Sequence, residues 1–121
     1  MTYEQALNYI HSAGRSSDGR GLERTRALLE KLGNPQRKTR FVHVAGTNGK
    51  GSTCAMLESV LRAAGYRTGL FTSPYLHRFN ERIRVGGEPI PDGELARLAA
   101  ALKPLAGQIG GMSEFELDTA L

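Results

Sequence analysis

The stretch FVHVAGTNGKGST, residues 41–53, constrains this chain more than any other part of it. It opens with aromatic and β-branched residues, passes three glycines around Lys50, and leads into apolar residues at helical spacing. A strand, a glycine-rich turn and a helix start follow one another in this order in proteins that cradle phosphate groups. We therefore expect a buried strand over residues 41–45 and a phosphate-binding turn directly after it.

The turn departs from the general phosphate-loop pattern GxxxxGK[ST] at two positions. Val44 stands where the first glycine is expected, and Gly51 follows Lys50 where serine or threonine is expected. The chemistry of a phosphate cradle is still present. The glycines let backbone N–H groups converge on an anion, the helix start adds its positive end, and Lys50 can reach terminal phosphates. The alternative is a glycine-rich turn between a strand and a helix that carries a surface lysine.

The periodicity of the remaining segments predicts an α/β fold. Residues 41–45 and 68–72 are expected to be strands joined by a helical crossover, which gives a right-handed βαβ unit and a parallel sheet. The segment 73–82 is expected to be an ordered loop at the carboxyl end of the second strand, and 83–90 a small hairpin. Apolar residues at helical spacing predict helices over residues 3–13, 22–32, about 55–64, 93–102 (ended by Pro104) and from 113 onward. Thr2-x-x-Gln5 is a capping-box pattern at the first of these helix starts.

Composition restricts the classes of function. The chain has 121 residues, enough for one domain, and its net charge of +4 suits anionic ligands such as nucleotides. It has no tryptophan and no basic cluster with aromatics, which argues against nucleic acid as a partner. It has one cysteine, no apolar run long enough to span a membrane and no signal-peptide pattern at its start, so we expect a cytoplasmic protein without membrane contact. Residues 113–121 are expected to be the beginning of a helix, which suggests a piece of a longer protein.

Three further stretches, taken with the loop, resemble a known family. AGTNGKGS, followed by TSPYLHRFNERI and preceded by GLER and LLEKLGNPQ, resembles folylpolyglutamate synthase, also called dihydrofolate synthase, of the Mur ligase superfamily. Glycine directly after lysine is that family's form of the loop. The resemblance extends over residues 3–121. It implies that these residues are the N-terminal part of an ATP-binding, P-loop NTPase-like domain, and that the later part of this domain and a C-terminal glutamate-binding domain lie beyond Leu121.

The resemblance also implies a reaction. Enzymes of this family use ATP and Mg²⁺ to phosphorylate a carboxylate, and the amino group of L-glutamate then attacks the acyl phosphate. The acceptor is dihydropteroate or a reduced folate, and the full-length enzyme is expected to be a monomer. The 121 residues alone are expected to bind nucleotide weakly, if at all, and to catalyse nothing.

Site residues follow from the same resemblance, position by position. Lys50 is implied to neutralise the β- and γ-phosphates, and Ser73 and Glu116 to hold magnesium. The sequence Ser113-x-x-Glu116 is also a capping box, and one side chain cannot easily serve both roles at once. The remaining residues of the nucleotide loop are Thr47, Asn48, Gly49, Gly51 and Ser52. The candidates for contact with the folate substrate are Ser17, Asp18, Gly19, Arg20 and Arg82, the arginines because a guanidinium suits bidentate pairing with carboxylates.

Two other functions are consistent with the residues. One is a Mur-type ligase that adds amino acids to a cell-wall precursor, although the LGNPQ and RFNERI segments favour folate. The other is a nucleotide-binding or switch module without ligase activity.

Overall fold

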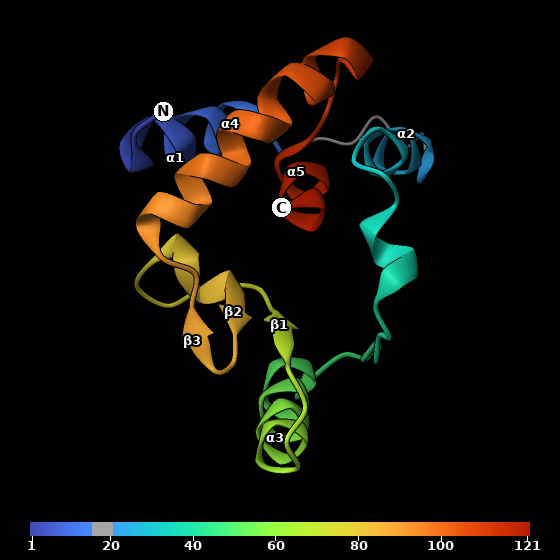
Figure 1. Cartoon of the computed structure of the whole chain (residues 1–121), viewed down its shortest axis with the longest axis vertical. Coiled ribbons are helices and arrows are strands. Elements are labelled where there is room, and N and C mark those ends of the chain that lie inside the picture. The colour runs from blue at the N-terminus through green and yellow to red at the C-terminus, as the bar shows by residue number, and fades with distance from the viewer. Residues whose placement is uncertain (16–20) are drawn as a thin grey trace. The chain divides into compact units, whose positions relative to one another are not determined.

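A computed structural model of the chain describes residues 1–15 and 21–121 (Figure 1). The chain forms two compact units. The first comprises Met1–Arg40 and Gly93–Leu121, and the second Phe41–Asp92. None of the helices among the described residues is long and apolar enough to cross a membrane.

The first unit is helical, and its core lies where α5 contacts α1 and α2. Its buried apolar cluster is Leu28, Leu102, Ala106, Met112 and Leu117. A second cluster of small residues comprises Ala6, Ala96 and Ala99. The elements are α1 (Tyr3–Ser12), α2 (Glu23–Lys31), the 3₁₀ helix η1 (Pro35–Lys38), α4 (Asp92–Ile109, whose first residue belongs to the second unit) and α5 (Glu114–Ala120).

Two capping boxes start helices of this unit, as their sequences predict. The Thr2 hydroxyl accepts from Gln5 N, and the Gln5 side chain accepts from Thr2 N. Ser113 and Glu116 form the same pair of bonds at the start of α5. Each box satisfies two N–H groups that a helix start leaves without a partner.

The prediction that Pro104 ends its helix is wrong, since α4 continues to Ile109. A proline inside a helix removes one hydrogen bond and costs about 3 kcal/mol. Leu102 and Ala106 flank Pro104 and are both buried in the core cluster. Their burial offsets the cost, so tertiary packing decides where this helix ends.

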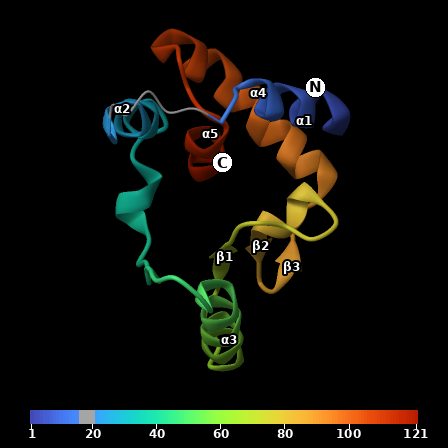
Figure 2. The ribbon, with the colours of Figure 1, turned by 180° about the vertical axis from the view of Figure 1, so that it is seen from behind.

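The sheet of the second unit is antiparallel, in contrast to the predicted parallel sheet. Its strand order is β1-β2-β3, and both pairings are antiparallel (Figure 2). Residues 41–45 form no strand, and Phe41 and Val42 are 70% and 65% exposed. A strand exists only with a hydrogen-bonded neighbour, and the described neighbour of β1 is β2. The elements are α3 (Lys50–Ala63), β1 (Gly69–Phe71), the 3₁₀ helix η2 (Phe79–Arg82), β2 (Ile83–Val85) and β3 (Glu88–Pro89).

Helix α3 is connected to the residue before β1 through a buried carboxylate, and not through the expected stripe of apolar side chains. Met56 and Val60 are exposed, whereas Glu58 is buried. Glu58 Oε1 accepts from Thr68 Oγ1 at 2.7 Å and from Arg62 Nε at 2.9 Å. The bond from Thr68 joins α3 to the residue just before β1, and the bond from Arg62 lies within α3.

The turn between β2 and β3 gives a test of this connection. An ideal Cβ at Gly87 would lie 2.9 Å from Arg62 Nε, whereas one at Gly86 would meet nothing within 4 Å. Both glycines have positive φ, so Gly86→Ala is expected to cost about 1 kcal/mol through backbone strain alone. Gly87→Ala is expected to cost more, because it also displaces Arg62 from Glu58. Urea unfolding of the two variants measures the difference, and equal losses would show that the Arg62 contact contributes nothing.

Candidate nucleotide loop and magnesium ligands

The predicted phosphate loop leads directly into the start of α3. Gly49 precedes the first helical residue, Lys50, and has a φ of +76°, a left-handed conformation that favours glycine. No side chain caps this helix start. The first N–H groups of α3 therefore keep the positive end of the helix available for an anion.

Lys50 is folded back over the loop. Its Nζ donates to Gly46 O at 2.7 Å and to Thr47 O at 3.3 Å, so the ammonium lies against the loop backbone. Gly51 lies in the first turn of α3, and a Cβ built there would meet nothing within 4 Å. No contact among the described residues requires glycine at position 51, and the space beside this turn is open in the described part of the chain. The predicted loop residues are all exposed, namely Thr47, Asn48, Gly49, Gly51 and Ser52.

The segment after β1 contains two predicted site residues. Ser73 is exposed. The Arg82 guanidinium carbon lies 5.3 Å from the centroid of the Tyr75 ring and 5.7 Å from that of Phe79. Arg82 therefore stacks on two aromatic rings, an arrangement that the sequence alone did not indicate.

Glu116, the other predicted magnesium ligand, accepts protein hydrogen bonds at both oxygens. Oε2 accepts from Ser113 N at 2.8 Å, and Oε1 accepts from Arg24 Nε at 3.2 Å. The Arg24 and Glu116 side chains are only 13% and 10% exposed. Burial raises the pKa of the Glu116 carboxyl, but the donors on Ser113 and Arg24 outweigh burial and hold this pKa below its ordinary value. The capping role of Glu116 is thus present, and an arginine already supplies its counter-charge.

The donor chemistry can be compared with what magnesium requires. Mg²⁺ in nucleotide sites takes one or two protein oxygens and completes its shell with phosphates and water. Among the described residues no group of three or more His, Cys, Asp and Glu side chains gathers, and this chemistry needs none. The exposed Ser73 hydroxyl fits such a site. Glu116 fits only if the cation replaces Arg24. Ser73 belongs to the second unit and Glu116 to the first.

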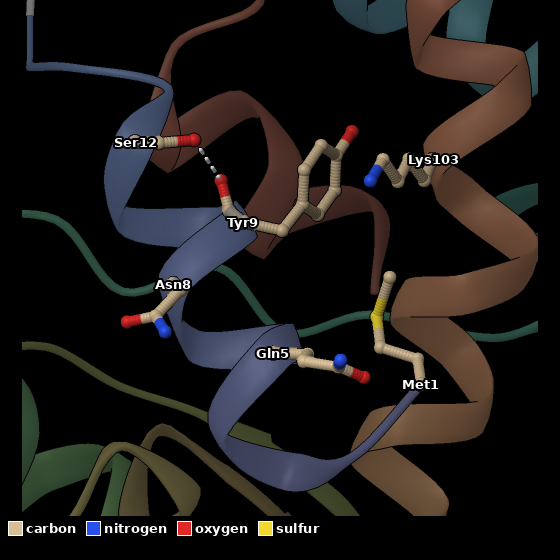
Figure 3. A pocket seen from close by; sticks show the side chains of 6 residues that line it. All are labelled: Met1, Gln5, Asn8, Tyr9, Ser12 and Lys103. Carbon is tan, nitrogen blue, oxygen red and sulfur yellow. Dashed lines mark hydrogen bonds between the residues drawn. The ribbon is translucent and has the colours of Figure 1, made fainter.

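The predicted substrate residues Ser17, Asp18, Gly19 and Arg20 lie outside the described residues. A surface hollow of the first unit is lined by side chains from α1 and α4 and by Met1 (Figure 3). In it Lys103 Nζ lies 5.4 Å from the centroid of the Tyr9 ring. None of the predicted site residues lines this hollow, whose lining residues are Met1, Gln5, Asn8, Tyr9, Ser12 and Lys103.

Comparison with known proteins identifies the family. No family model matches the chain. The dihydrofolate synthase/folylpolyglutamate synthase of Bacillus subtilis is 46% identical over 98% of this chain, and the folylpolyglutamate synthase of Lacticaseibacillus casei is 46% identical over all of it. The chain belongs to the folylpolyglutamate synthase/dihydrofolate synthase family. This confirms the resemblance carried by the AGTNGKGS and TSPYLHRFNERI motifs.

The solved structures of the family agree. A folylpolyglutamate synthase in complex with AMPPCP and folate superposes with a TM-score of 0.92 at 41% identity, over 99% of this chain and 31% of the solved one. The α/β class is confirmed, with the small three-stranded sheet described above. The chain spans about 30% of the length of the curated relatives that it matches.

Proposed function

We propose that this chain supplies the nucleotide loop of an ATP-dependent ligase that joins L-glutamate to the carboxylate of dihydropteroate or a folate. The observation that carries the proposal is Lys50, held over Gly46 and Thr47 at the uncapped start of α3. The family supports it, since a related structure contains AMPPCP and folate together. We further propose that residues 1–121 are the N-terminal part of the ATP-binding domain of such an enzyme.

The chemistry explains why this loop is needed. A carboxylate is a poor acyl donor at neutral pH, and its conversion to an acyl phosphate supplies a leaving group that the amine of glutamate can displace. In phosphoryl transfer, the protein mainly positions the reacting groups and neutralises the charge of the phosphates. Lys50 would exchange its two carbonyl acceptors for phosphate oxygens, and the N–H groups of the loop and of the first turn of α3 would hold the remaining phosphate oxygens.

Magnesium, when bound, would neutralise phosphate charge and help to orient the transferring group. We propose that the Ser73 hydroxyl is one of its ligands. Glu116 stays a prediction as a second ligand, because it would have to exchange Arg24 Nε for the metal.

For the substrate, we propose contacts with Arg82 and with Ser17, Asp18, Gly19 and Arg20, four residues outside the described part of the chain. Arg82 presents a guanidinium already ordered by two rings, so it would lose little conformational entropy on pairing with a substrate carboxylate. A cytoplasmic location and a monomeric full-length enzyme remain part of the proposal.

Titration with magnesium–AMPPCP, followed by amide NMR of the ¹⁵N-labelled chain, tests the nucleotide part even if binding is weak. We expect shifts at the amides of residues 46–53 and their loss in Lys50→Ala. Lys38→Ala, which removes an exposed lysine of η1, is the matched control and should retain them. A parent titration in which other amides shift while those of residues 46–53 do not would contradict the proposal. Shifts that persist unchanged in Lys50→Ala would contradict the role of Lys50.

A further inference from the structure

Three consecutive backbone N–H groups of the second unit converge on one carboxylate. Leu76 N donates to Glu81 Oε1 at 3.1 Å, and His77 N and Arg78 N donate to Glu81 Oε2 at 3.0 and 2.7 Å. Successive N–H groups arranged in this way form a concave anion site. Here the anion is the chain's own Glu81. Its pKa lies below the ordinary value, chiefly because the N–H groups of Arg78 and His77 donate to it.

Burial of the Leu76 side chain does not explain the backbone conformation of residues 76–78. The Leu76 side chain is 85% exposed, although its backbone N–H is bonded. A loop that presents a large apolar side chain to solvent gains little from the hydrophobic effect. The carboxylate of Glu81 therefore fixes the backbone at residues 76–78 together with the bonds of the Arg78 side chain to Asp92.

The helix η2, which contains Glu81, is held in place by hydrogen bonds of its neighbouring residues. The Asn80 side chain is 2% exposed, and its Nδ2 donates to Ile90 O at 2.6 Å and to Asp92 Oδ1 at 3.0 Å. Arg78 Nη2 donates to both oxygens of Asp92, at 2.8 and 2.9 Å. These bonds hold η2 against the residues that follow β3. Glu81 belongs to η2, so its backbone is held in place by the same bonds.

The segment held in this way includes proposed site residues. Ser73 lies three positions before Leu76, and Tyr75 lies directly before it. The Tyr75 ring meets the Phe79 ring edge-on, with centroids 6.1 Å apart, and carries the Arg82 guanidinium. Tyr75 is bonded directly to Leu76, and two residues separate Ser73 from Leu76, so the backbone position at 76–78 constrains where Tyr75 and Ser73 lie.

We infer that Glu81 is a positioning residue, which fills the backbone N–H site of residues 76–78 and thereby sets the place of Ser73 and Tyr75. It acts through the backbone N–H groups that it binds. Its link to catalysis rests on the proposed function, in which Ser73 holds magnesium. The hold on the backbone does not depend on that function.

Glu81→Gln tests the inference, because glutamine keeps the shape and loses the charge and one acceptor oxygen. Exchange of the Leu76, His77 and Arg78 amides is expected to accelerate about 10-fold or more, since hydrogen bonds to a charged acceptor are the stronger ones. Exchange in the buried part of α4, at Ala99 and Leu102, should not change. Glu94→Gln is the matched control, because the described partner of Glu94 is its near neighbour Arg97. Unchanged exchange at all three loop amides in Glu81→Gln would overturn the inference.

Two further measurements separate the role of Glu81 from that of the Leu76 side chain and from the magnesium role of Ser73. Leu76→Ala removes the exposed side chain and keeps the N–H, so it should leave amide exchange as in the parent; acceleration equal to that in Glu81→Gln would overturn the inference. Manganese with AMPPCP should broaden the Ser73 signal in the parent and in Glu94→Gln, and much less in Glu81→Gln, while the shifts of residues 46–53 seen with magnesium–AMPPCP persist in all three. Equal broadening in Glu81→Gln would contradict the positioning of Ser73. Absence of broadening in the parent would reject the magnesium role of Ser73, and amide exchange would still decide the role of Glu81.

Discussion

Lys50→Ala is expected to lower glutamate-dependent ADP release by about 100- to 1,000-fold in a hybrid enzyme that carries these 121 residues. In the hybrid, they replace the matching part of the Bacillus subtilis relative, which is 46% identical over this region. The loss is large because one preorganised charge is removed from the place where phosphoryl charge is transferred. Gly46 and Gly49 have positive φ values that glycine adopts at little steric cost, so we expect the loop backbone to survive the loss of the two bonds that Lys50 Nζ donates to Gly46 O and Thr47 O.

The matched control for this prediction is Lys38→Ala in the same hybrid, which should retain activity within about 2-fold. Both variants lose one positive charge, so a general electrostatic effect on nucleotide attraction would lower both. Similar activities of the two variants would contradict a specific role for Lys50.

Glu116→Ala is expected to lower the free energy of unfolding by about 3 kcal/mol, the second large effect. It removes the acceptor of the Ser113 N–H and leaves the nearly buried Arg24 without this counter-charge. Glu116→Gln should cost less, because glutamine is the other residue that completes a capping box. Gln5 performs this function in the same chain, where its Oε1 accepts from Thr2 N at 2.8 Å.

Urea unfolding of the two Glu116 variants checks this prediction. A third variant, Arg24→Met combined with Glu116→Gln, should recover part of the loss, since it removes both charges of the pair. Glu116→Ala within about 0.5 kcal/mol of the parent would show that the ion pair and the cap contribute little. The same Glu116→Gln variant separates the two roles of this residue, because it keeps the cap and removes the charge that a magnesium ion would need.

Local sequence signals predicted the local features of the fold. The spacings Thr2-x-x-Gln5 and Ser113-x-x-Glu116 indicated two helix starts, and both boxes are formed. The glycines around Lys50 indicated a turn into a helix, and α3 begins at Lys50. Such features depend on residues three or four positions apart, so one stretch of sequence contains all the partners.

Features that depend on distant partners were not predictable in this way. Residues 41–45 have the composition of a strand, but the sheet of this unit pairs β1 with β2 and includes no strand from them. The Arg24–Glu116 pair joins residues 92 positions apart, and no pattern in either segment indicates the other. Glu81 could have been noticed from its place three residues after Arg78, but the convergence of three N–H groups on it appears only in three dimensions.

The direct test of the central proposal is the acceptor dependence of ADP release by the unmodified hybrid. The proposal predicts release that requires both L-glutamate and dihydropteroate or a reduced folate, and that produces the corresponding amide. A hybrid that folds and hydrolyses ATP equally with and without these two substrates would contradict it, as would one that accepts a cell-wall nucleotide-sugar peptide in place of the folate.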